Sequence, residues 1–139
     1  MILFRQWFGV LFVFLLVSCA KPPENPPTYL VTGRVLLEGN PAHGAVVILH
    51  PSNGEATTNR PRAKTDAKGE FTLTTFTNGD GAPAGDYTVT VEWKRADDHP
   101  EQGTDLLPSV YSDPKTSKLK VTITPGNNEP LSLKLSRKP

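Results

Sequence analysis

The chain has 139 residues, with 15 basic and 14 acidic side chains and a formal net charge of +1. This length is sufficient for one domain and too short for two. The balanced charge excludes the strongly basic surface that is typical of nucleic-acid-binding proteins, so we expect no nucleic-acid partner.

The chain begins with an apolar segment that ends at its single cysteine. Residues 2–17 carry one charge, Arg5, and are otherwise mostly apolar. This run is shorter than the roughly 20 apolar residues of a membrane-spanning helix. Its basic start, apolar centre and small final residues are typical of a secretory signal peptide. The four residues Leu16-Val17-Ser18-Cys19 resemble the bacterial lipobox, in which the cysteine sulfur receives a diacylglyceryl group and the cysteine becomes the first mature residue.

We therefore predict a lipoprotein signal peptide over residues 1–18 and lipidation at Cys19. The protein would then be a membrane-anchored lipoprotein of the bacterial cell envelope, facing the periplasm or the cell surface. An ordinary cleavage site that leaves Cys19 as a free cysteine is the alternative. If Cys19 is lipidated, no thiol remains for a disulfide or for a cysteine metal site.

Residues 19–28 are predicted to connect the lipid to the folded domain. Four of the residues in 22–27 are proline, which excludes a helix or a central strand because proline lacks the N–H group and fixes φ. We expect an extended spacer about 20–25 Å long that holds the domain clear of the lipid headgroups.

Residues 29–137 are predicted to form one β domain, because apolar and polar residues alternate with a period of two in short runs. Glycine-rich and asparagine-rich turn sequences separate these runs, and no clear helical period follows the signal segment. In the turn 66–69, Gly69 is expected to have a positive φ, and residues 63–65 are expected to pair with 70–75 across it. The pattern predicts an all-β fold, a seven-stranded antiparallel Greek-key β-sandwich. The expected strands are 31–37, 45–50, 63–65, 70–75, 87–93, 119–123 and 131–135.

Several turns and strands together resemble the small bacterial carboxypeptidase regulatory-like lipoproteins. The segments that carry the resemblance are Gly33-Arg-Val35, Glu38-Gly-Asn-Pro41, 44–51, 64–75, 79–91, 108–119 and the closing Leu-x-Leu-x-Leu strand. They cover essentially all of residues 29–137. The resemblance implies a transthyretin-like, or prealbumin-like, sandwich that is not an enzyme, and it transfers no catalytic residues.

The histidines do not show an arrangement that is typical of a catalytic or zinc site. A nucleophilic triad needs a serine or cysteine near a histidine that a carboxylate orients, and no Gly-x-Ser-x-Gly sequence accompanies His43, His50 or His99. Zinc needs three or four convergent ligands, and neither a His-x-x-x-His nor a Cys-x-x-Cys pair is present. We expect no catalytic residues and no cofactor.

Calcium is the better metal candidate, because it is bound by oxygen atoms alone. Two loops are rich in such atoms, although neither has the spacing of an EF-hand. The candidate ligands are Asp80 and Asp86 in or after the first loop, and Asp97, Asp98, Glu101 and Asp105 in the second. The alternative is that residues 78–81 form a tight turn and that the carboxylates are solvated. We expect the alternative, and therefore no metal.

The remaining features concern surfaces. Tyr87 and Trp93 are in register with core residues, whereas Tyr29 and Tyr111 lie near strand ends and are expected to be partly exposed. Val46 and Ile48 face outward, so either the loop 51–62 covers them or they contact a partner protein. The segment 94–108 is predicted to be a long loop.

These observations predict a monomeric, lipid-anchored, non-enzymatic envelope protein that acts as a structural or protein-interaction module. Its partners would be the membrane, through Cys19, and an envelope protein or polysaccharide. A carbohydrate-binding or calcium-binding surface or periplasmic lipoprotein is the alternative.

Overall fold

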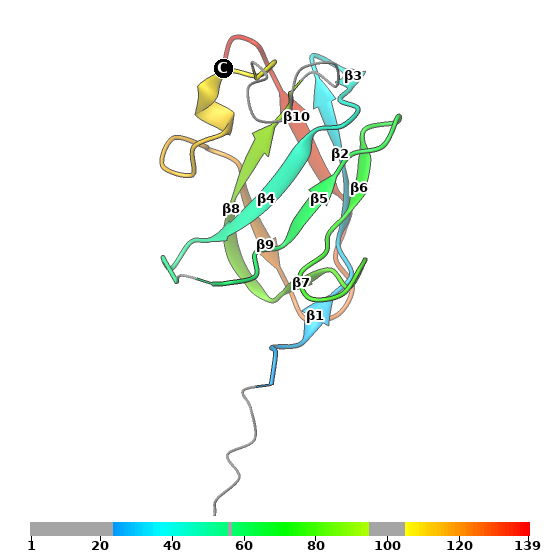
Figure 1. The fold of residues 1–139 in the computed structure, drawn as a ribbon, viewed down its shortest axis with the longest axis vertical. Coiled ribbons are helices and arrows are strands. Elements are labelled where there is room, and N and C mark those ends of the chain that lie inside the picture. Colours follow the sequence, from blue (N-terminus) through cyan, green and yellow to red (C-terminus); the bar gives the residue numbers. More distant parts are fainter. Residues whose placement is uncertain (1–23, 56, 95–104) are drawn as a thin grey trace, which may run out of the picture.

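The fold is all-β, as the alternation predicts. The structure, a computed structural model, describes residues 24–55, 57–94 and 105–139 (Figure 1). These residues form ten strands and one turn of 3-10 helix, η1 (Ser109–Tyr111). The strands are β1 (Thr28–Tyr29), β2 (Thr32–Leu37), β3 (Asn40–Pro41), β4 (Val46–Pro51), β5 (Arg62–Lys64), β6 (Glu70–Thr72), β7 (Ala82–Pro83), β8 (Gly85–Glu92), β9 (Lys120–Ile123) and β10 (Leu131–Leu135).

The strands form two four-stranded sheets and one small sheet. One large sheet has the order β5-β4-β8-β9, and all its pairs are antiparallel. In the other, β2 lies beside β10 and also pairs with β3 and β6. The short strands β1 and β7 pair with each other at the end where the N-terminal segment joins the domain (Figure 1).

One strand pair contradicts the expectation of a fully antiparallel fold. Strand β10 runs parallel to β2, with partners from Leu131↔Gly33 to Leu135↔Leu37. A hairpin would force antiparallel pairing, but the connection from β9 to β10 crosses between the two large sheets. The last strand, β10, therefore lies beside β2 and runs in the same direction.

The number of strands is also larger than the expected seven. Seven strands have three or more residues, and β1, β3 and β7 have two each. A two-residue strand is too short to show an alternating pattern, and both β3 and β7 contain proline, which usually argues against a strand. These short strands could not be found from periodicity.

The core lies between the two large sheets. In the register Val47↔Val91 and Leu49↔Val89, all four side chains are fully buried. The opposite sheet contributes buried side chains such as Val35, and all these residues belong to one cluster. The arrangement is consistent with a β-sandwich. The buried apolar residues are Val31, Val35, Leu37, Ala42, Ala45, Val47, Leu49, Phe71, Leu73, Ala82, Tyr87, Val89, Val91, Leu107, Tyr111, Ile123, Leu133 and Leu135.

The turn at residues 66–69 connects the two sheets instead of forming a regular hairpin. Strand β5 pairs with β4, and β6 pairs with β2. The expected pairing survives only at its ends, where Asp66 N–H donates to Glu70 O (2.9 Å) and Arg62 exchanges two backbone hydrogen bonds with Thr74. The expected positive φ of Gly69 is confirmed, at +73°. Its Cβ position would lie 2.5 Å from the Val35 carbonyl oxygen, so the turn packs directly against β2.

Candidate functional site

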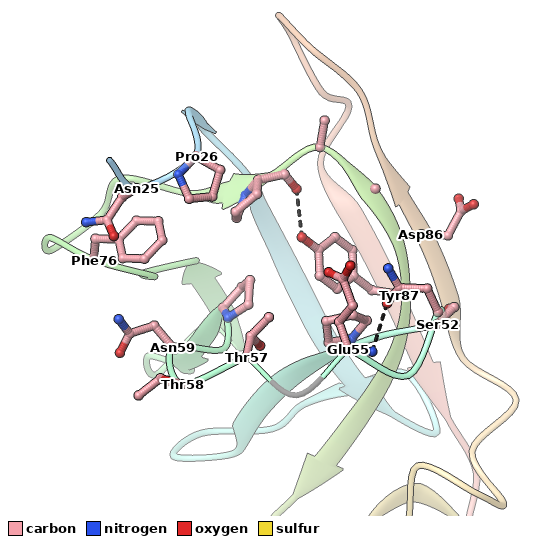
Figure 2. A pocket seen from close by; sticks show the side chains of 16 residues that line it. Asn25, Pro26, Ser52, Glu55, Thr57, Thr58, Asn59, Phe76, Asp86 and Tyr87 are labelled. Carbon is pink, nitrogen blue, oxygen red and sulfur yellow. Dashed lines mark hydrogen bonds between the residues drawn. The ribbon is translucent and has the colours of Figure 1, made fainter. Parts of the chain in front are cut away.

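An open cavity of about 840 Å³ lies at the end of the domain where the N-terminal spacer enters. It is formed by segments that are far apart in the sequence: the spacer, the loop after β4, the turn after β6 and the start of β8. Figure 2 shows the side chains that surround it. Its lining residues are Asn25, Pro26, Pro51, Ser52, Asn53, Glu55, Thr57, Thr58, Asn59, Pro61, Phe76, Pro83, Ala84, Gly85, Asp86 and Tyr87.

The loop between β4 and β5 is held at both ends. Ser52 N–H donates to Asp86 O (2.9 Å), which ties the beginning of the loop to β8. At its end, Leu49 N–H donates to Pro61 O (2.9 Å). Between these points, the side chains of Thr57, Thr58 and Asn59 make no hydrogen bond to another described residue. Their donors and acceptors are therefore available to a ligand.

Tyr87 forms the inner wall of the cavity. The residue is 5% exposed, and its hydroxyl donates to Pro83 O (2.9 Å), which fixes the connection between β7 and β8. Burial raises the pKa of the Tyr87 phenol, so this group stays neutral near pH 7. The tyrosine offers the cavity an apolar ring and a neutral polar group.

Phe76 lies on the opposite side of the cavity, beside Asn25 (Figure 2). A tight turn presents it there. The Asp80 carboxylate accepts hydrogen bonds from the backbone N–H groups of Thr75 (2.7 Å), Phe76 (3.0 Å) and Thr77 (3.0 Å). Burial by itself would raise the pKa of Asp80, but these hydrogen bonds outweigh it and lower the pKa below its usual value. The half-buried Phe76 ring is thus fixed at the edge of the cavity.

The spacer forms part of the wall because the next residues dock on the domain. Strand β1 pairs with β7 through Thr28↔Pro83 and Tyr29↔Ala82. This pairing needs glycine at position 81, where φ is +88° and a Cβ atom would collide with the Tyr29 carbonyl group. The pairing of β1 brings Asn25 and Pro26 to the cavity.

Among the described residues, the lining has two acidic side chains, Glu55 and Asp86, and includes no lysine, arginine or histidine. The Asp86 carboxylate accepts a hydrogen bond from the Thr122 hydroxyl (2.6 Å). The other polar groups are amides and hydroxyls, and the apolar lining comes from proline and aromatic rings. The site therefore suits a neutral, polar ligand better than an anionic one.

The structure separates the calcium candidates that it describes. Asp80 holds the turn before β7, Asp86 lies at the cavity, and Asp105 accepts hydrogen bonds from the N–H groups of Trp93 (3.0 Å) and Leu107 (2.9 Å). Within residues 24–55, 57–94 and 105–139, no three His, Cys, Asp or Glu side chains are grouped so that they could hold a metal ion. The other candidates, Asp97, Asp98 and Glu101, lie outside the described residues, as does Cys19.

The two described histidines, His43 and His50, each lie beside a residue in or directly after β8 and not in a cluster of catalytic side chains. The His43 side chain is exposed, and its backbone oxygen accepts a hydrogen bond from the Trp93 indole N–H (2.7 Å). His50 Nε2 lies 2.9 Å from the Thr90 hydroxyl. Burial, and then the charge of Arg60, lower the pKa of His50, so its ring is neutral at pH 7. His99 lies outside the described residues.

The burial of the tyrosines, Trp93 and Val46 agrees with the sequence-based expectations only in part. Tyr111 is only 8% exposed, and its hydroxyl oxygen accepts a hydrogen bond from Ser136 N–H (2.9 Å), so the expectation that it is partly exposed was wrong. Tyr29 is half-buried and Tyr87 is in the core, whereas Trp93 is only half-buried. Val46 remains 36% exposed on the outer face of the β5-β4-β8-β9 sheet.

Sequence reasoning did not identify the cavity. It located the polar loop 51–62 but attached no role to Asn25, Asn59 or Phe76. The available signal was the high content of Ser, Thr and Asn in that loop, which is typical of many solvated loops. Only the arrangement of the four segments around one space distinguishes this loop from others.

Comparisons with known protein families, curated proteins and solved structures found no match to this chain. In the part of the chain that the structure describes, no helix has the length and hydropathy that are needed to cross a membrane.

Proposed function

We propose that this protein is a lipid-anchored, non-enzymatic binding module of the bacterial cell envelope, built on a transthyretin-like Greek-key sandwich of the carboxypeptidase regulatory-like type. The strand order supports the fold assignment. Strands β4 and β5 are adjacent in one sheet, and β6 returns to the other sheet to pair with β2. Among the strands of three or more residues, the fourth, β6, lies beside the first, β2, which is one feature of a Greek key.

The observation that carries the binding role is the cavity beside the spacer. The β1–β7 pair docks the segment that follows the predicted lipid site, so Asn25 and Pro26 line the same space as Tyr87. A ligand site at the membrane-facing end of an anchored domain would meet components at or near the membrane surface. The partner is therefore an envelope component, as the resemblance and the predicted anchor also suggest.

Two measurements on the full chain in a bacterial host test this proposal. Cys19→Ser should abolish incorporation of labelled palmitate and release the protein from the membrane fraction, because a multi-acyl anchor provides the firm attachment. Ser18→Ala, which keeps a small residue before the cysteine, is the matched control and should be labelled normally. Continued labelling of the Cys19→Ser chain would contradict the anchor.

The second measurement places a photo-crosslinking residue in the cavity. A crosslinker at Thr58 should capture an envelope component in intact cells, whereas one at Lys134, on the exposed face of β10, should not. Equal capture at the two positions, or none at Thr58, would contradict a binding role for the cavity. A second candidate function, saccharide binding, is favoured by the chemistry of the lining and is developed next.

A further inference from the structure

We infer that the cavity beside the spacer binds a saccharide without acidic groups, with Phe76 as the stacking surface and Asn25 and Asn59 as hydrogen-bonding partners. This inference rests on the proposed function, because it names the class of ligand that the binding module takes. It follows from the lining chemistry, from the polar groups that lack protein partners, and from the lack of a long unpaired strand edge among the described residues at the cavity.

The described lining of the cavity holds no cation. An acidic saccharide, a phosphate or a nucleotide would need one at its anionic group. The lining residues that the structure describes include no lysine, arginine or histidine, and Arg60, between the lining residues Asn59 and Pro61, is not itself part of the lining. The acidic side chains Glu55 and Asp86 would repel such a ligand. They can instead accept hydrogen bonds from sugar hydroxyl groups, which are neutral donors.

The cavity lining contains several polar side chains without a protein partner. Among the described residues, the side chains of Asn25, Thr57, Thr58 and Asn59 form no hydrogen bond with another protein group, although all four line the cavity. Amides and hydroxyls both donate and accept, as the hydroxyl groups of a sugar do. The lining thus offers a mixed set of donors and acceptors that a hydrophobic ligand would leave unsatisfied.

The Phe76 ring provides an apolar surface at the edge of the cavity. Figure 2 shows the Phe76 ring beside Asn25, across the cavity from Tyr87 and Ser52. The Asp80 turn fixes the backbone at Phe76, so the ring is placed before the ligand arrives. The C–H face of a sugar ring can pack on an exposed aromatic ring while its hydroxyl groups reach the surrounding amides.

The strand edges near the cavity favour a saccharide over an extended peptide. A peptide that binds by strand addition needs an unpaired strand edge. Around the cavity, β8 is paired on both sides, with β4 and β9, and β4 lies between β5 and β8. Strand β7 has one open edge, but it is only two residues long and Pro83 has no N–H group to donate to a peptide strand. Most of the other lining residues lie in loops. The cavity therefore favours recognition by side chains, which suits a saccharide.

The test uses the full lipidated chain in detergent micelles. The protein is applied to an array of neutral, amino and acidic saccharides and to a peptide array, and the best saccharide is then titrated by calorimetry. We expect binding to neutral or N-acetylated sugars and none to acidic sugars. Binding to acidic sugars or to peptides instead, or to nothing on either array, would overturn the inference.

Variants then locate the binding site. Phe76→Ala and Asn59→Ala should each weaken binding about tenfold, whereas Asn127→Ala, at an exposed asparagine away from the cavity, should leave the affinity unchanged. Phe76→Leu keeps an apolar side chain without the ring and should also weaken binding, which guards against a misfolded Phe76→Ala protein. Unchanged affinity in the folded Phe76→Leu and Asn59→Ala proteins would overturn the assignment.

These outcomes separate the inference from the proposal on which it rests. If the crosslinker at Thr58 captures a protein and no saccharide binds, the saccharide inference fails while the envelope binding role stands. If Cys19→Ser is still labelled with palmitate, the anchor fails, and the saccharide titration remains a valid test of the cavity by itself.

Discussion

Asp80 shows how one side chain organises a local structure that carries part of the candidate site. Both carboxylate oxygens accept backbone hydrogen bonds, Oδ1 from Thr75 and Oδ2 from Phe76 and Thr77. An aspartate that the sequence offered as a calcium candidate thus has three N–H partners within its own turn. The same turn places Phe76 at the cavity, so turn stability and the position of the Phe76 ring depend on one carboxylate.

We expect Asp80→Ala to lower the free energy of unfolding by about 1–3 kcal/mol at pH 7, because three N–H groups lose their acceptor. The pKa of Asp80 is lowered in the folded state, so its contribution is present above the usual carboxyl value and is lost as the pH falls through the lower folded pKa. The deficit of the variant should therefore shrink in acid. Urea unfolding at pH 7 and in acid measures it.

Asp113→Ala is the control for this prediction, because the Asp113 carboxylate accepts one backbone hydrogen bond, from Lys115 N–H (2.8 Å), rather than three. Its effect should be smaller. If the two variants are equally stable at pH 7, the Asp80 hydrogen bonds do not hold the turn as described.

At the scale of elements, the turn between β5 and β6 is a corner between sheets. The alternation located β6 and the turn sequence located β5, but their partners are β2 and β4 rather than each other. Gly69 makes the corner possible, because it combines a positive φ with a close approach to the carbonyl group of Val35. A side chain at this position would push the corner away from β2.

Gly69→Ala is expected to destabilise the domain by more than the 1–3 kcal/mol or so that an unfavourable φ costs, because the Cβ atom also meets Val35 O. Gly39→Ala is the matched control, since Gly39 has a similar φ of +83° but no atom within 4 Å of its Cβ position. Comparing the thermal unfolding of the two variants separates the cost of the contact with Val35 O from the cost of the positive φ. Equal losses would mean that β2 does not contact the turn at this point.

At the scale of the whole molecule, one core joins both large sheets, and the cavity depends on their relative position. Tyr87 belongs to the core and also forms the inner wall of the cavity. The spacer reaches the cavity because β1 docks on β7. If either sheet unfolded, the shared core would be exposed and the cavity would be lost at the same time.

We expect the mature chain in detergent to unfold in a single thermal transition whose midpoint is the same with calcium, with EDTA and with a reductant. The physical reason is that the core is continuous and that the Asp80 carboxylate is already engaged by backbone N–H groups. Differential scanning calorimetry measures both the number of transitions and the midpoint temperature. A large calcium-dependent rise in the midpoint would favour the calcium-binding alternative, and two transitions would contradict a common core.

The amino-acid sequence by itself determined the longer strands and most of the residues that face the core, because alternation is a local pattern and a strand places every second side chain on one face. The six alternating runs, and residues 63–65 before the turn, each overlap a strand of three or more residues. It also predicted the positive φ at Gly69, which turn chemistry requires. Two-residue strands lie below the length at which any period can be recognised.

Only the tertiary structure decided which strands are neighbours and where a site forms. The parallel pair β2–β10 joins residues about a hundred positions apart, and no local pattern encodes that pairing. Tyr111 is buried because it packs in the core, and its hydroxyl accepts a hydrogen bond from the N–H group of Ser136, which lies beyond the last strand. The cavity is formed where Asn25, Asn59, Phe76 and Tyr87 meet. Their proximity follows from sheet packing, because each residue taken alone has the same chemistry as any exposed or core residue of its type.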